Sequence, residues 1–220
     1  MNDLHRFDLI CFDWDGTLFD STAIIARCIQ EAVVDVGGAR PSAQDAAFVI
    51  GLSLGPALAR VAPDIPREKY VALGARYREH YLAHQNDISL FAGVLPLIRE
   101  LRQKGCHLAV ATGKSRRGLD EVLTSRALSG LFDGSRTADE TAGKPNPRML
   151  LELMREFGAP PERTLMIGDT SHDLEMARNA GCASVGVSYG AHRSEDLDAL
   201  GALFVARSVP DLRAWLEARV

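Results

Sequence analysis

The chain has 220 residues, 46% hydrophobic and 25% charged, which is the composition of a globular protein and excludes a disordered or fibrous one. Its formal net charge is −4 and no basic run stands out, so we expect no binding to nucleic acid. Every apolar stretch is interrupted by a charge before it reaches the roughly 20 residues that a bilayer requires, so no membrane association is expected. The N-terminus lacks an apolar core of signal-peptide length, and the four cysteines are scattered. We therefore expect a cytoplasmic protein without disulfides.

Two kinds of segment alternate along most of the chain. Short apolar runs that end at a polar residue are typical of buried parallel strands, and here they are Phe7–Asp13, His107–Thr112, Arg163–Asp169, Ala183–Ser188 and the weaker Leu203–Ala206. Amphipathic stretches predict helices over Val94–Lys104, Ser115–Arg126, about 150–157, Ser171–Ala180 and Val209–Ala218. This alternation predicts a doubly wound, Rossmann-like α/β fold with a parallel sheet.

One long segment, between about residues 20 and 90, breaks the alternation. It contains no convincing strand, and its apolar spacing predicts helices over 25–36, Ser42–Ile50, Leu54–Val61 and Pro66–His84. We interpret it as an inserted helical domain, residues 19–90. The α/β core domain then comprises residues 1–18 and 91–220.

Polar residues follow the predicted strands at the edge where such sheets bind ligands. Asp13 and Asp15 come after the first strand, Thr112 ends the second, and Asp169 follows a later one. Three carboxylates crowded together would repel each other, and a hard cation removes the conflict. Mg²⁺ takes oxygen ligands, and a substrate phosphate commonly supplies some of them. Lys144 adds a second positive charge near these carboxylates. The pattern indicates a magnesium and phosphate site.

The motifs that carry these residues are D-W-D-G-T-L at 13–18, Thr112, Lys144 before a proline, and G-D-x-x-x-D at 168–173. In this order they resemble the four motifs of the haloacid-dehalogenase-like hydrolase superfamily. The helical insert resembles the cap of its first subfamily. Three stretches, D-G-T-L-F-D-S, A-G-V-L-P-L-I-R-E-L and V-A-T-G-K-S, are similar to the phosphoglycolate-phosphatase-like branch.

The resemblance implies a role for each acidic residue. Asp13 is then the nucleophile that forms an aspartyl-phosphate, and Asp15 is the general acid and base. The Asp13 carboxylate, the Asp15 backbone carbonyl and Asp169 would hold Mg²⁺. Asp173 would support the metal ligands from the second layer.

The resemblance also implies a phosphate cradle and a reaction. Thr112, Gly113 and Lys144 would bind the transferring phosphoryl group. The implied activity is Mg²⁺-dependent hydrolysis of a small, phosphoglycolate-like phosphate monoester through a phosphoaspartate intermediate. The expected partner is therefore a small phosphorylated metabolite, and the chain is expected to be a monomer or homodimer.

Several alternatives stay open at this point. The chain could be a phosphomutase of the β-phosphoglucomutase type, a pyrophosphate or nucleotide phosphohydrolase, or a non-enzymatic module switched by aspartate phosphorylation. The uncharged loop Gly51-Leu52-Ser53-Leu54 favours a hydrolase over a mutase, whose corresponding loop usually carries basic residues. An adjacent acid at Asp15 and the long insert argue against the signalling module.

Residues near these motifs receive ordinary structural interpretations. Ser21 is expected to cap a helix, and the loop 51–53 is either a plain turn or an element that faces the active site. A tyrosine stripe at 70, 77 and 81 is expected to be core. We expect four polar residues to be surface groups: Lys114, Arg116, Arg117 and His172.

Overall fold

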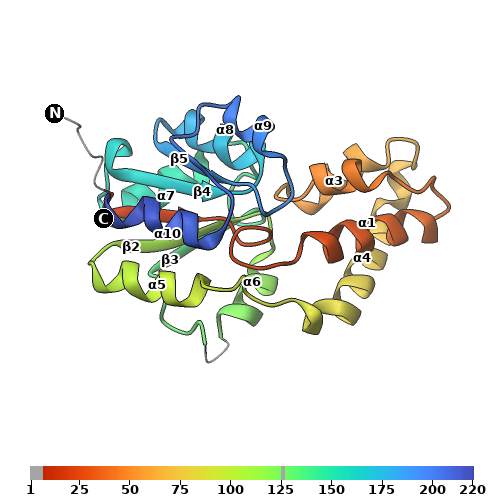
Figure 1. Ribbon diagram of the computed structural model, residues 1–220. Helices are drawn as coiled ribbons and strands as arrows, with labels where there is room; N and C mark the ends of the chain where they lie inside the picture. Colours follow the sequence, from red (N-terminus) through yellow and green to blue (C-terminus); the bar gives the residue numbers. More distant parts are fainter. Residues whose placement is uncertain (1–6, 125–126) are drawn as a thin grey trace.

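The computed structural model describes residues 7–124 and 127–220 (Figure 1). Its centre is a parallel sheet of six strands in the order β3-β2-β1-β4-β5-β6. The strands are β1 (Leu9–Phe12), β2 (His107–Thr112), β3 (Gly134–Thr137), β4 (Thr164–Gly168), β5 (Ala183–Val187) and β6 (Val205–Ala206). The strand order reverses between β1 and β4, and a doubly wound sheet binds its ligands at the carboxyl ends of such a pair.

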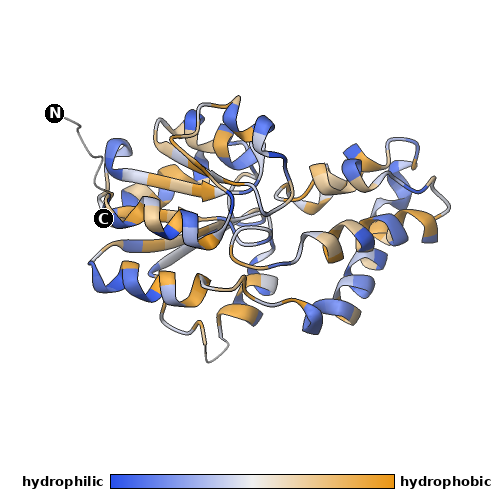
Figure 2. Cartoon of the chain, viewed as in Figure 1, coloured by the Kyte–Doolittle hydropathy of each residue, from blue (hydrophilic) through white to orange (hydrophobic). Residues whose placement is uncertain are grey.

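Helices cover both faces of this sheet: α5 (Val94–Gln103), α6 (Arg116–Leu123), α7 (Arg148–Phe157), α8 (Ser171–Ala180), α9 (Ser194–Asp198) and α10 (Val209–Glu217). Alternate residues of β1 point to opposite faces, as the period of a strand requires. Ile10 and Phe12 pack in the cluster that includes α5 and α10, whereas Leu9 and Cys11 pack with α7 and α8. In Figure 2 the arrow of β4 carries the hydrophobic colour, whereas the helices mix hydrophobic and hydrophilic colours.

The segment between β1 and α5 is helical and lies beyond the carboxyl ends of the strands (Figure 1). It contains α1 (Thr22–Asp35), α2 (Ala43–Phe48), α3 (Leu54–Val61) and α4 (Tyr70–His84), with short 3-10 turns at Arg67–Lys69 and Gln85–Asp87. We call residues 22–87 the cap. The cap has its own hydrophobic cluster, in which Leu58 and Leu73 are fully buried. The domain boundaries at 18/19 and 90/91 stay predictions.

The predicted fold class is confirmed, and each predicted strand and helix has a counterpart. Two elements were missed, β3 and α9. β3 reads Gly-Ser-Arg-Thr and lies at the sheet edge, where the apolar run of a doubly buried strand is not required. The helix predicted to Arg126 ends at Leu123, and residues 125–126 lie outside the described residues. Among the described residues, the helices are too short or too polar to span a bilayer.

Candidate active site

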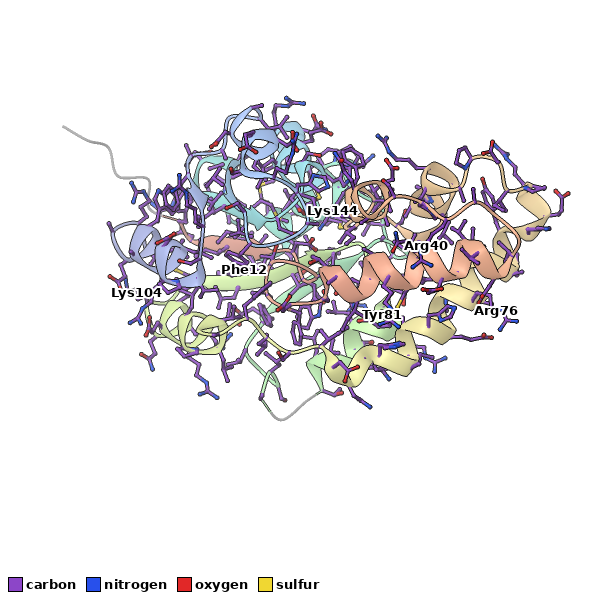
Figure 3. The ribbon with its side chains drawn as sticks, turned by 45° about the vertical axis from the view of Figure 1, so that its right-hand side comes forward. Phe12, Arg40, Arg76, Tyr81, Lys104 and Lys144 are labelled. Carbon is purple, nitrogen blue, oxygen red and sulfur yellow. The ribbon has the colours of Figure 1, made fainter. Side chains whose placement is uncertain are left out.

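A buried lysine joins two carboxylates at the carboxyl ends of β1 and β4. Lys144 Nζ lies 2.7 Å from Asp13 Oδ1 and 2.6 Å from Asp173 Oδ1, and all three side chains are buried. Figure 3 shows Lys144 between the sheet and the cap. Asp173 has a second task, because its Oδ2 accepts hydrogen bonds from the backbone N–H and the hydroxyl of Thr170 and so caps the start of α8. Asp173 therefore serves both the start of α8 and the buried lysine.

The other oxygen of Asp13 has no partner. Asp13 Oδ2 is buried and accepts no hydrogen bond from any described residue. Three aspartates bring one carboxylate oxygen each within 4.8 Å of one another, and they are Asp13, Asp169 and Asp173. An oxygen-only donor set of this size is the type that a hard divalent cation such as Mg²⁺ prefers. These residues therefore fit a metal ion, and the Asp15 carboxylate is not among the grouped atoms.

Asp169 is held by groups from two loops. Its Oδ1 accepts from the Thr17 hydroxyl at 2.8 Å, and its Oδ2 accepts from the Ala191 backbone N–H at 2.8 Å. Two glycines make room for it, since a Cβ on Gly16 would lie 2.1 Å from Asp169 Oδ2 and one on Gly190 would lie 2.3 Å from the same oxygen. Gly16 also has a φ of +81°, which glycine adopts freely. The turn after β1 is thus shaped around this carboxylate.

The electrostatics of the cluster reflect its burial. Burial raises the pKa of Asp13 well above its ordinary value, and Lys144 opposes the rise. Burial, reinforced by Asp173, raises the pKa of Asp169 to about 7. For Lys144, burial favours the neutral amine, but Asp13 and Asp173 outweigh it and raise its pKa. Lys144 is therefore a cation beside Asp13, a carboxylate that resists ionisation without a further positive charge.

The Asp15 carboxylate lies in a separate network. Lys114 Nζ donates to both oxygens of Asp15 at 2.9 and 3.1 Å, and Ser21 Oγ donates to Oδ1 at 2.8 Å. Lys114 Nζ also donates to the hydroxyl of Tyr81, on α4, at 2.9 Å. The predicted surface position of Lys114 is wrong, because only 12% of its side chain is exposed. Ser21 stands at the start of α1, but its side chain makes no capping hydrogen bond.

One of the other surface predictions agrees with the structure, because the Arg117 side chain is 90% exposed. The Arg116 side chain is half-buried and pairs with Asp120 and Glu140. His172 is buried, and this prediction is wrong. The tyrosine stripe packs against the cap cluster as expected, although the hydroxyl of Tyr81 reaches the core through Lys114.

His172 belongs to a contact between core and cap. Its Nε2 donates to the backbone carbonyl of Phe48, at the end of α2, at 2.9 Å, and His192 Nε2 donates to the same oxygen at 3.1 Å. The tautomer of His192 follows from Nδ1, which accepts from the Ser171 N–H. The Phe48 ring stacks on His192 with ring centroids 5.0 Å apart. Burial lowers the pKa of both histidines, so both favour the neutral form.

The cap loop at 51–53 lies directly over the predicted phosphate cradle. A Cβ on Gly113 would lie 2.5 Å from the carbonyl oxygen of Gly51, and one on Gly143 would lie 3.1 Å from Ser53 Oγ. A Cβ on Gly51 itself would lie 3.8 Å from Asp13 Oδ2. Thr112 is buried beside this contact, and its hydroxyl accepts from the Lys114 backbone N–H at 3.2 Å. Of the two interpretations of this loop, the structure agrees with the one in which the loop faces the active site.

This contact predicts that Gly113→Ala impairs activity. The added methyl would overlap the Gly51 carbonyl, so the cap loop must move away from Asp13. Overpacking of this kind costs about 1–3 kcal/mol, and borne by the arrangement with the loop over Asp13 it corresponds to roughly a 5- to 150-fold loss of kcat/KM. Gly55→Ala is the matched control, because a Cβ there meets nothing within 4 Å. Equal kcat/KM values for the two variants would contradict the prediction.

Comparison with known proteins agrees with this arrangement. Residues 10–187 match the haloacid dehalogenase-like hydrolase family. The chain is 32% identical over 198 residues to a phosphoglycolate phosphatase of Aliivibrio fischeri (86% of this chain, 87% of the relative). It is 30% identical over 209 residues to pyrophosphatase PpaX of Halalkalibacterium halodurans (94% and 95%).

A solved structure of a hydrolase from Pseudomonas syringae covers 96% of this chain and 98% of its own, with a TM-score of 0.86 and 27% identity. The predicted superfamily resemblance is thereby confirmed. The match spans the loops after β1, β2 and β4 together with the whole cap. This chain belongs to the haloacid dehalogenase-like hydrolase family.

Proposed function

We propose that this chain is a phosphatase that hydrolyses a small phosphate monoester through a phosphoaspartate at Asp13. The observation that supports this most is the state of that carboxylate. Asp13 Oδ1 is fixed by Lys144, while Oδ2 is buried under the cap loop and has no hydrogen-bond partner in the described part of the chain. A nucleophile needs one oxygen held and one oxygen free for the phosphorus atom.

The proposed metal is Mg²⁺, held by Asp13, Asp169 and the backbone carbonyl of Asp15, with Asp173 in support. Bound there, it would supply positive charge that allows a phosphate dianion to approach a carboxylate. The protein adds the fixed ammonium of Lys144 and the hydroxyl of Thr112 on the phosphoryl group. These groups stabilise charge by position, which is most of what phosphoryl transfer requires.

The proposed reaction has two transfers. In the first, an Asp13 oxygen forms a bond to phosphorus, the bond from phosphorus to the ester oxygen breaks, and that oxygen takes a proton from Asp15. In the second, a water oxygen attacks the phosphorus and gives a proton to Asp15, and the bond from phosphorus to Asp13 breaks. Inorganic phosphate and the alcohol leave, and both aspartates return to their starting states.

The cap supports a preference for small substrates. The loop 51–53 contacts the core at Gly113 and Gly143 without charged side chains, and closure over the site excludes water. Phosphoproteins and nucleic-acid ends would not fit beneath it. The cytoplasmic location and the monomeric or homodimeric state remain predictions.

A panel of phosphate esters assayed with purified protein and Mg²⁺ tests the proposal. We expect release of phosphate from 2-phosphoglycolate and p-nitrophenyl phosphate. Pyrophosphate is the second candidate substrate, because a pyrophosphatase is among the relatives that align over nearly the whole chain. Conversion of a sugar phosphate into its isomer without phosphate release would indicate a mutase. Phosphorylation without turnover would indicate a signalling module.

The acidic cluster predicts stabilisation by Mg²⁺ that depends on pH. The pKa of Asp169 is raised to about 7 in the fold, so in the metal-free protein the unfolding free energy falls as pH rises from about 4 to about 7. At pH 8 Asp169 is ionised, and saturating Mg²⁺ should add about 3 kcal/mol, which raises Tm by roughly 5–10 °C. The shift should be smaller at pH 5.5, where a proton competes with the metal.

Thermal unfolding with and without Mg²⁺ at the two pH values checks this prediction. Asp169→Asn should lose the shift, whereas Asp198→Asn, an exposed acid at the end of α9, should keep it. A Tm shift of the same size in Asp169→Asn would remove Asp169 from the metal site.

A further inference from the structure

We infer that Lys114 and the hydroxyl of Tyr81 form a subsite for a second anionic group on the leaving alcohol or acid. This inference rests on the proposed function, in which Asp15 faces the leaving oxygen. Neither residue belongs to the phosphate cradle, and they come from different parts of the molecule. Lys114 follows β2 in the core, and Tyr81 lies near the end of α4 in the cap, facing the core (Figure 3).

Position is the first argument. A general acid must lie within hydrogen-bond distance of the oxygen that it protonates, about 2.6–3.2 Å. Lys114 Nζ lies 2.9 Å from Asp15 Oδ2, so the ammonium is one contact away from the leaving oxygen. An anionic group one or two bonds beyond that oxygen would meet the ammonium.

Charge is the second argument. Among the described residues, two cations form ion pairs with Asp13, Asp15 or Asp173, and they are Lys144 and Lys114. Lys144 is fully buried between Asp13 and Asp173, on the side of the phosphoryl group. Lys114 retains some exposure, and the cap loop 51–53 offers no charge of its own. We therefore expect a second anionic group of the substrate to bind the ammonium of Lys114.

Tyr81 completes the subsite. Its hydroxyl oxygen accepts from Lys114, so its own O–H is free to donate to an anion. Burial raises the pKa of Tyr81, which keeps the phenol protonated. The centroid of the Tyr81 ring lies 4.8 Å from Lys114 Nζ, a distance at which the ring face attracts the cation.

Ser21 keeps Asp15 in position when Lys114 binds the substrate instead of Asp15. The Ser21 hydroxyl holds Asp15 Oδ1 independently of Lys114. When a substrate anion takes the ammonium, Asp15 stays oriented and its Oδ2 becomes free for the leaving oxygen.

The chemical class that fits is a phosphate ester or anhydride whose leaving group carries a negative charge next to the scissile oxygen. In 2-phosphoglycolate a carboxylate lies one carbon from that oxygen. In pyrophosphate the scissile oxygen itself belongs to the second phosphate. Both place an anion at Lys114, and an ester of a simple alcohol does not.

Substrate ranking in Lys114 variants tests the inference. The assay compares kcat/KM for 2-phosphoglycolate, pyrophosphate and ethyl phosphate, all with Mg²⁺. Lys114→Met should lower kcat/KM for the two anionic leaving groups about 10- to 100-fold more than for ethyl phosphate, because a charge-assisted hydrogen bond is lost. Lys114→Arg should recover part of the difference, and Tyr81→Phe should show a smaller loss of the same selectivity.

Arg117→Met is the matched control, since it removes an exposed cation from α6, three residues after Lys114. It should leave the ranking of the three substrates unchanged. An equal loss on all three substrates in Lys114→Met, with wild-type Tm, would overturn the inference and would leave Lys114 as a support for Asp15 alone. Selectivity for 2-phosphoglycolate or for pyrophosphate alone would identify which anion the subsite fits.

A binding experiment separates this inference from the proposed function. Methylenediphosphonate and methylphosphonate are not hydrolysed, and their Kd values can be measured by calorimetry with Mg²⁺ present. Wild type should bind methylenediphosphonate more tightly than methylphosphonate. In Lys114→Met the ratio of the two Kd values should fall at least tenfold. If no ester is turned over, the proposed function fails while this result still reports on Lys114. If wild type shows no preference, the subsite fails while turnover of ethyl phosphate can still support the phosphatase.

Discussion

Replacement of Asp13 by asparagine should abolish turnover of every phosphate ester, by about 10⁴- to 10⁶-fold. The amide has nearly the volume of the carboxylate, so the buried packing should persist, but it is a poor nucleophile toward phosphorus. It also removes a negative charge that burial makes costly. Phosphate release and thermal unfolding, measured on the same preparation, check both parts of the prediction.

Asp20→Asn is the matched control for this variant. Asp20 lies seven residues further along the same connection, is exposed, and forms no ion pair among the described residues. It should retain wild-type turnover. If Asp13→Asn kept more than about one hundredth of wild-type activity, well above the range expected on loss of a nucleophile, Asp13 would not be the attacking group.

Asp15→Asn should impair the enzyme in a way that depends on the leaving group. Loss of a general acid is typically worth about 10²- to 10⁴-fold, and we expect that loss for 2-phosphoglycolate. Nitrophenolate leaves without a proton, so p-nitrophenyl phosphate should still phosphorylate the enzyme. Hydrolysis of the phosphoenzyme should then be slow, because Asp15 no longer serves as the base.

Rapid mixing with p-nitrophenyl phosphate checks this second prediction. Asp15→Asn should release one equivalent of nitrophenolate in a burst, followed by a slow steady state. Equal losses for the two esters with no burst would remove Asp15 from both proton transfers.

Much of the fold could be predicted because buried parallel strands leave a strong signal. His107–Thr112 is bounded in the structure as in the prediction, and Leu54–Val61 is likewise a helix. The edge strand β3 carries Arg136 and two hydroxyl side chains, so its pattern is that of a loop. Its pairing with β2 depends on tertiary contacts that local composition does not encode.

The acidic part of the site could be anticipated for a topological reason. Asp13 and Asp169 follow β1 and β4, which are paired neighbours, so their carboxylates must meet. Lys114 follows β2 by the same logic, but a lone lysine in a turn resembles a solvated charge. Its burial depends on Tyr81, 33 residues earlier in the chain, and only the docked cap brings the two together.

The predictions for Ser21 and His172 were wrong for different reasons. Ser21 stands at a helix start, where a serine side chain commonly bonds the local backbone, and His172 was expected to be a surface group but is buried. Their actual partners are Asp15, six residues before Ser21 in the same connection, and the Phe48 carbonyl at the end of α2. The contacts of His172 and Lys114 with the cap were therefore the part of the site that sequence patterns could not resolve.

Trapping of the acyl phosphate tests the central claim most directly. Wild-type enzyme is mixed with substrate and Mg²⁺, quenched, and reduced with borohydride, which converts a phosphorylated aspartate into homoserine. Mass spectrometry of the peptide that contains Asp13 should then show homoserine at residue 13. The homoserine should be absent when substrate is omitted. Modification of a different residue, or rapid turnover with an unmodified Asp13 under the same quench, would contradict the account.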